Sequence, residues 1–177
     1  MNWDDLTTAQ PRLAEHARRR LLSPGVLLIG TVRRDGTPRI SPVEPFVLDG
    51  RLLLSMLWQS RKAADLLRDP RILVHSIVTS RDGGDGEVKL RGTAPPVEDR
   101  TIQQRYAEAV GETLGWHPVV GRFHLFEVDV EHVVTFRYDD ATGDQYVASW
   151  PPGREFVRRG TSATSLGEPQ EHHELLV

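Results

Sequence analysis

The fold is decided by residues 25–57, which read GVLLIGTVRRDGTPRISPVEPFVLDGRLLLSML. This stretch contains three apolar segments separated by two short Asp-Gly turns, at residues 25–32, 39–48 and 51–57. An Asp-Gly pair between apolar segments is a strong hairpin signal, so the pattern predicts three antiparallel strands in a meander. Pro42 and Pro45 lack an amide N–H, which indicates that the second strand lies at a sheet edge or contains a bulge.

The flanking sequence extends this pattern in both directions. Residues 3–22 carry apolar residues at helical spacing and form a predicted helical lead-in, which Pro11 divides. Downstream, we expect short helices at 60–69 and 98–114 and further strands at 72–78, 87–94, 122–130, 132–138 and 144–150. Six or more strands with short helices between them predict a mainly β protein of the α+β class, built as a small antiparallel barrel.

Length and composition define the class of protein. The 177 residues suit one domain, which we place at 1–159, followed by a C-terminal arm over 160–177 that begins rich in Gly, Ser and Thr. The chain contains no cysteine, which excludes disulfides, thiolate catalysis and cysteine-bound metal centres. Two histidines at zinc-binding spacing with a glutamate do not occur, so we expect no metal site.

The same composition limits the partners. No apolar run is long enough to cross a bilayer and the N-terminus does not resemble a signal peptide, so we expect a cytoplasmic protein without membrane contact. The net charge is −3, and the arginines are spread along the chain, which argues against nucleic-acid binding. Only two of the 22 basic residues are lysines, Lys62 and Lys89.

The most informative local motif is Ser60-Arg61-Lys62 at the start of the helix predicted over 60–69. Ser60 is a good N-cap, because its hydroxyl can accept a hydrogen bond from a free amide of the first turn. Arg61 and Lys62 then place positive charge at the positive end of the helix dipole, which is unfavourable for an isolated helix. A bound anion reverses that balance, so the motif predicts a phosphate site.

Around this motif the sequence resembles the pyridoxamine 5'-phosphate oxidase-like family of FMN-binding split β-barrels. The similarity covers about residues 20–95 and continues more loosely to 150. It rests on an ordered set of short segments, namely the hairpin 31–43, the strand end at 54–57, the basic turn 60–62 and the helix exit Leu67-Arg68-Asp69-Pro70-Arg71. The resemblance implies a split β-barrel and an FMN-dependent oxidoreductase that transfers hydride through the flavin N5.

The resemblance also implies which residues hold the cofactor. Ser60, Arg61 and Lys62 match the turn that binds the FMN phosphate. The flavin ring is expected to lie against two strands, which contribute Ser55, Met56 and Leu57, and Arg39, Ile40, Ser41 and Val43. Lys89 and Trp150 match positions beside the ring near a subunit interface, and the family pattern implies a homodimer with the cofactor between the subunits.

Lys89 also has a chemical rationale, since a cation near the flavin N1 stabilises the negative charge of the reduced ring. Arg39 could serve the same purpose, and an exposed place on the polar face of its strand is the other interpretation of Lys89. His75 lies within an apolar strand, where a hydrogen-bonded core or interface residue is expected.

The sequence departs from the family after Trp150, where the Arg-x-His element that holds the substrate phosphate in true pyridoxamine phosphate oxidases is missing. Oxidation of vitamin B6 is therefore not the expected reaction, and the substrate is left open. Two alternatives stand beside the FMN enzyme. One is a reductase that uses a deazaflavin coenzyme on the same fold, and the other is a flavin- or haem-binding protein without catalysis. No residue was identified as a catalytic acid or base.

Overall fold

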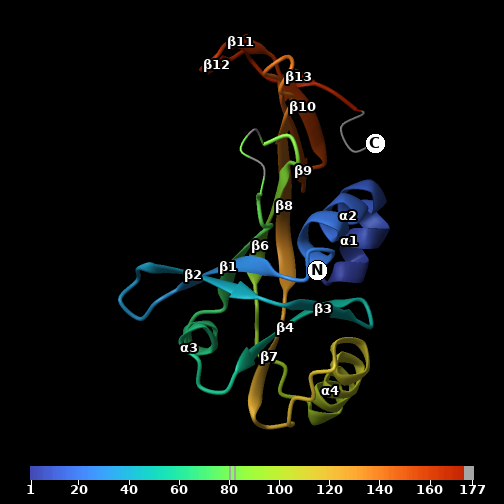
Figure 1. Cartoon of the computed structure of the whole chain (residues 1–177), viewed down its shortest axis with the longest axis vertical. Helices are drawn as coiled ribbons and strands as arrows, with labels where there is room; N and C mark the ends of the chain where they lie inside the picture. Colours follow the sequence, from blue (N-terminus) through green and yellow to red (C-terminus); the bar gives the residue numbers. More distant parts are fainter. Residues whose placement is uncertain (80, 82, 174–177) are drawn as a thin grey trace.

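The structure is a computed structural model that describes residues 1–79, 81 and 83–173 (Figure 1). Most strands belong to two antiparallel sheets, one large and one small. The large sheet has the order β13-β10-β9-β8-β6-β5-β1-β2, and the small sheet has the order β3-β4-β7. This mainly antiparallel architecture with short helices confirms the predicted fold class and agrees with a split β-barrel.

The large sheet forms the long axis of the molecule in Figure 1. Its first hairpin pairs β1 (Leu27–Val32) with β2 (Pro38–Val43), and β1 also pairs with β5 (Arg71–His75). The sheet then continues through β6 (Glu87–Thr93), β8 (Asp129–Tyr138) and β9 (Gln145–Trp150). It ends with β10 (Arg154–Arg158) and β13 (Gln170–Glu171).

The small sheet contains β3 (Pro45–Leu48), β4 (Arg51–Leu57) and β7 (Phe123–Glu127). The two faces of this sheet pack against different clusters of residues, because side chains alternate along β4. Leu54 and Met56 point into the main hydrophobic core, whereas Ser55 and Leu57 pair with β7 residues of the other face. That other face is covered by α4 (Arg100–Leu114), whose Tyr106 packs in a second cluster.

The N-terminal helices close the main core. As predicted, Pro11 divides the lead-in into α1 (Trp3–Ala9) and α2 (Pro11–Ala17), and a short π-helical turn, η1 (Arg18–Leu22), follows. The apolar stripe of these helices is fully or almost fully buried at Leu6, Leu13 and Leu21. The helices therefore complete the barrel core rather than forming a separate arm.

The sequence prediction of one strand over 39–48 is wrong in one respect. The segment breaks at Glu44, so that β2 joins the large sheet and β3 joins the small sheet. Pro42 and Pro45 flank the break, and because neither can donate a ladder hydrogen bond, a continuous central strand is disfavoured there. The edge position expected from these prolines is confirmed for β2, which ends the large sheet.

The segment after Trp150 is also more structured than predicted. β10 lies within the predicted domain, and the predicted arm that begins at residue 160 contains a small hairpin of β11 (Gly160–Ser162) and β12 (Ser165–Leu166) and then β13, which pairs with β10. The strands are short and polar, so their period-2 pattern is too weak to be recognised from the sequence. Residues 174–177 of the predicted arm lie outside the described residues.

Two further observations concern membrane-spanning helices and metal sites. In the described part of the chain, no helix is long and apolar enough to cross a membrane. Among the same residues, no three His, Asp or Glu side chains are grouped so that they could hold a metal ion.

Candidate functional site

A cavity of about 540 Å³ lies where the two sheets, α3 (Arg61–Arg68) and α4 meet. Its lining combines the β2–β3 junction, the end of β4, the first turn of α3 and the C-terminal part of α4. The residues that line it are Pro42, Glu44, Pro45, Phe46, Ser55, Met56, Leu57, Lys62, Tyr106, Val110, Leu114 and Trp116. Four of the predicted cofactor residues, Ser55, Met56, Leu57 and Lys62, are therefore brought together in one cavity.

The walls of the cavity are mainly apolar, and its polar groups are few. Tyr106 shares a hydrogen bond with Ser55 at the inner end. Burial, which outweighs this hydrogen bond, raises the pKa of the Tyr106 hydroxyl, so the group is protonated at neutral pH. Glu44 supplies the only carboxylate among the lining residues. An apolar slot with a few polar groups is the usual form of a site for an organic ligand.

The first turn of α3 forms the basic edge of the cavity. The Ser60 hydroxyl accepts a hydrogen bond from the Ala63 amide at 3.4 Å, which confirms the predicted N-cap. Arg61 is exposed, and the Lys62 ammonium donates a hydrogen bond to the Pro42 carbonyl at 2.7 Å. Partial burial lowers the pKa of Lys62, and the carboxylate of Glu44 acts in the opposite direction. No acidic residue occupies the first turn of α3, so an anion here meets the helix dipole and two cations together.

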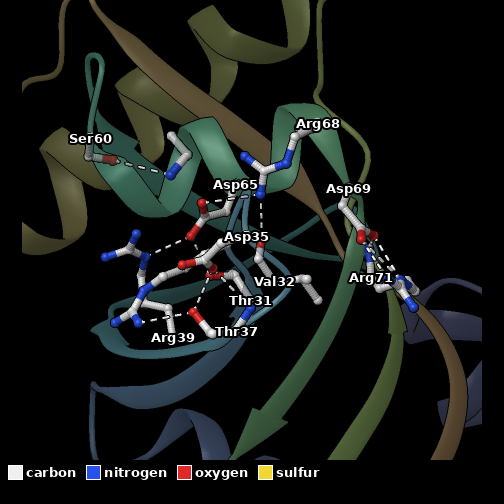
Figure 2. A network of polar contacts seen from close by, with 12 residues as sticks. Thr31, Val32, Asp35, Thr37, Arg39, Ser60, Asp65, Arg68, Asp69 and Arg71 are labelled. Carbon is white, nitrogen blue, oxygen red and sulfur yellow. Dashed lines mark hydrogen bonds and ion pairs between the residues drawn. The ribbon is translucent and has the colours of Figure 1, made fainter.

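A buried carboxylate holds α3 in place against the β1–β2 hairpin, as Figure 2 shows. Asp65 of α3 is almost completely buried and accepts hydrogen bonds from Arg39 at 2.6 Å and from Thr31 at 3.0 Å. Arg68, one turn further along α3, contacts the same carboxylate at 3.3 Å and also donates to the Val32 carbonyl. Burial alone would raise the pKa of Asp65, but these three hydrogen bonds outweigh it and lower the pKa below its usual range.

The predicted cofactor residues of β2 have different surroundings in this chain. The Arg39 guanidinium faces the Asp65 carboxylate on the inner side of β2 and is not part of the cavity lining. Ser41 and Val43 lie on the same side of the strand, and Val43 is fully buried in the core. Ile40 lies on the opposite side and is 74% exposed. From β2, it is Pro42 that reaches the cavity.

Lys89 and Trp150 also lie apart from the cavity of this chain. Lys89 pairs with Glu87 at 2.6 Å, lies over the Phe136 ring and lines a separate hollow. Glu87 also contacts His75 at 3.2 Å, and the other ring nitrogen of His75 lies 2.6 Å from the Ser76 carbonyl, so His75 is hydrogen-bonded as expected. Trp150 packs against the main core.

Several lining residues were not predicted from the sequence. Tyr106, Val110 and Leu114 have helical spacing, a pattern that predicts the helix but does not distinguish cavity residues from core residues. Glu44 could have been suspected, because a charged residue between two prolines at a strand break is seldom needed for packing. Trp116 follows Gly115, whose φ of 69° ends α4, and no local signal distinguishes it from a loop residue.

Comparison with known proteins assigns the family. The family model for pyridoxamine 5'-phosphate oxidase matches residues 13–137, more than half of the chain. The chain belongs to this family. The matched range contains every residue that lines the cavity, including those from both helices. The cavity therefore lies within the part of the chain that the family model describes. No curated protein sequence matches the chain.

Several solved structures share the fold at low sequence identity. One relative is a pyridoxamine 5'-phosphate oxidase homologue from Listeria innocua, with 17% identity, a TM-score of 0.54, and coverage of 71% of this chain and 93% of the other. A haem-binding protein from Mycobacterium smegmatis has 16% identity, a TM-score of 0.56 and coverage of 92% and 89%. The haem storage protein HutZ from Vibrio cholerae has 19% identity, a TM-score of 0.54 and coverage of 69% and 89%.

The cavity residues can be tested against the chemistry of FMN. An isoalloxazine ring needs a flat apolar slot with a few hydrogen-bonding groups, and the phosphate needs cations and free amides. The lining of the cavity is mainly apolar with a few polar groups, and the start of α3 supplies two cations and free amides at Arg61 and Lys62. The residues therefore fit FMN in kind.

Proposed function

We propose that the protein binds FMN in this cavity and acts as a flavin-dependent oxidoreductase. The observation that carries the proposal is the continuity between an apolar slot and the basic first turn of α3, because these two surfaces match the two halves of FMN. Membership of the pyridoxamine 5'-phosphate oxidase family supports it. When bound, the flavin supplies hydride transfer through N5.

The residues of this chain bind and orient the cofactor. Arg61, Lys62 and the free amides of the first turn hold the phosphate dianion. To do so, the Lys62 ammonium exchanges its hydrogen bond with the Pro42 carbonyl for one with phosphate oxygen. The apolar side chains of Leu57, Leu114 and Trp116 exclude water from the reacting face, which strengthens electrostatic interactions there. The protonated Tyr106 hydroxyl and the Glu44 carboxylate are the polar groups available to the ring edge or to a substrate.

The identity of the bound cofactor tests the proposal directly. The chain is purified from cells, its ligand is released, and the mass of that ligand is measured. The protein without ligand is then titrated with FMN, a deazaflavin coenzyme and haem. We expect FMN to bind at a ratio of one per chain. Tight binding of deazaflavin alone would favour the alternative reductase on the same fold. Exclusive haem binding, as named for two of the structural relatives, would overturn the enzyme in favour of a carrier.

Turnover is measured separately from binding. The FMN-loaded protein is reduced without oxygen by NADPH, and reoxidation by a panel of acceptors is followed by flavin absorbance. An oxidoreductase is expected to complete both half-reactions repeatedly. A protein that binds FMN tightly but exchanges electrons no faster than free FMN would be a flavin carrier, and the catalytic part of the proposal would be wrong.

We further infer that the protein forms a homodimer through the outer face of the large sheet. On this face, Ile40 is 74% exposed and Leu73 is 44% exposed, and they flank Gly30 across three adjacent strands. In the next cross-strand row lie Pro42, Leu28, His75 and Lys89. Because Pro42 also lines the cavity, a second copy on this face would border the flavin site.

The predicted oligomer can be tested with charge substitutions. Glutamate at Ile40 and Leu73 would bury unpaired charge in the proposed interface. The I40E/L73E variant is therefore expected to reduce the mass in solution from about 40 kDa to the 19.9 kDa of one chain. Light scattering after size exclusion at micromolar concentration measures this. L114E is the control, because Leu114 is similarly exposed at 60% but lies on α4. If I40E/L73E leaves the mass of a dimeric protein unchanged, the interface lies elsewhere.

A further inference from the structure

A second, smaller hollow lies on the other side of the α3 N-terminus. Its volume is about 350 Å³, and the side chains that line it combine aromatic, apolar and charged groups from the ends of β4, β7 and α4. They are Trp58, Leu67, Pro96, Val97, Glu98, Arg100, Gln103, Gly121, Phe123, His124 and Leu125. Leu67 is 51% exposed and Trp58 is 46% exposed, so two large apolar surfaces face outward at this place.

The wall of the hollow carries a preformed aromatic platform. The rings of Trp58 and His124 are stacked, with centroids 4.6 Å apart and planes inclined by 7°. The Gln59 amide donates a hydrogen bond to His124 Nε2 at 3.3 Å, and Gln59 has a φ of 59°, which a non-glycine residue seldom adopts. Burial lowers the pKa of His124, which favours the neutral ring that can accept this bond. The His124 ring, which the Gln59 amide holds, therefore supports one face of the Trp58 indole.

The platform is placed beside the proposed phosphate site. Leu57 and Trp58 are consecutive, and they line the larger cavity and the hollow, respectively. The same division holds in α3, where Lys62 lines the cavity and Leu67 lines the hollow. The cavity and the hollow are therefore adjacent at the end of β4, and the basic first turn of α3 begins three residues after Trp58.

We propose that this hollow binds the adenylate moiety of a dinucleotide, with the purine stacked on Trp58 and the phosphate of the adenylate near Arg100. The inference rests on the proposed flavin site, since the diphosphate must continue from it. Arg100 contributes a cation at the rim, which suits the ribose-phosphate. Purine stacking needs one accessible ring face, and because His124 covers one face of Trp58, the purine would stack on the opposite face of this 46% exposed side chain.

Two molecules can bring an adenylate to this place. FAD would extend the bound flavin itself, whereas NADPH would bring the hydride donor to the flavin. The affinities of FMN, FAD, NADPH and AMP are therefore measured for the wild-type chain and for W58A, W58F and W116A. W116A is the matched control, because Trp116 is 41% exposed but lines the larger cavity.

We expect the dinucleotide that occupies the hollow, either FAD or NADPH, to bind W58A about 10-fold more weakly than the wild type. W58F should retain most of the affinity, since the aromatic face is kept. FMN affinity should stay the same in W58A and fall in W116A. A loss confined to FAD assigns the adenylate to the cofactor, and a loss confined to NADPH assigns it to the hydride donor. Thermal unfolding verifies that each variant is folded.

The outcomes separate this inference from the proposed function. Binding of FMN with affinities for FAD, NADPH and AMP that do not depend on Trp58 would overturn the adenylate site and leave the flavin site standing. Trp58-dependent binding of AMP by a chain that binds no flavin would support the adenylate site and refute the proposed cofactor.

Discussion

Replacing both Arg61 and Lys62 with alanine is expected to weaken FMN binding about 100-fold and riboflavin binding less than about threefold. Riboflavin has the same ring but no phosphate, so its affinity measures binding to the apolar slot without the contribution of the phosphate site. Two charge-assisted hydrogen bonds to a phosphate contribute several kcal/mol when fully formed, and exposure of Arg61 reduces that value to about 3 kcal/mol for the pair. The measurement is a fluorescence titration of both ligands at fixed ionic strength.

The control for this variant is R34A, which removes an exposed arginine from the turn between β1 and β2 and should change neither affinity. Salt provides a second check, because added KCl should weaken FMN binding in the wild type more than in the double variant. Equal losses of FMN and riboflavin would show that the two side chains support the slot and do not bind phosphate.

The D65N variant is expected to lose about 3 kcal/mol of unfolding free energy and roughly 10 °C in Tm. Asparagine keeps the volume but removes the charge, so Arg39 and Arg68 are left without their ion-pair partner at a buried position. Chemical denaturation and calorimetry measure the change. D69N is the control, because Asp69 pairs with a largely exposed Arg71 and should leave Tm nearly unchanged.

The effect of Asp65 should depend on pH with a definite sign. Its folded pKa lies below the unfolded value, so the unfolded chain takes up the proton first as the pH falls. The stability difference between wild type and D65N should therefore be complete above about pH 4 and shrink as the pH falls through the folded pKa. A difference that stays constant down to pH 2 would contradict an ionised, hydrogen-bonded Asp65.

Local chemistry made part of this structure predictable. The Asp-Gly turns, the N-cap at Ser60 and the stop at Pro70 each act within a few residues, and the hairpins and α3 follow them closely. The family resemblance, and not a local pattern, pointed to Ser55, Met56 and Leu57, and all three line the cavity.

The remaining part depends on contacts between distant segments. Tyr106 and Trp116 reach the cavity only because α4 packs on the small sheet, and no local pattern specifies that docking. The contact between Arg39 and Asp65 is of the same kind, because the two residues are 26 positions apart and no local pattern pairs them.

The alternation along β4 has a consequence for how the family can diversify. Leu54 faces the core, where a change of volume reduces stability, but Leu57 faces the cavity and is 73% exposed. Leu114 and Trp116, which also line the cavity, are exposed as well. Mutations at these three positions can change which molecule is accepted while folding stability is preserved, so ligand preference and stability can evolve separately in this fold.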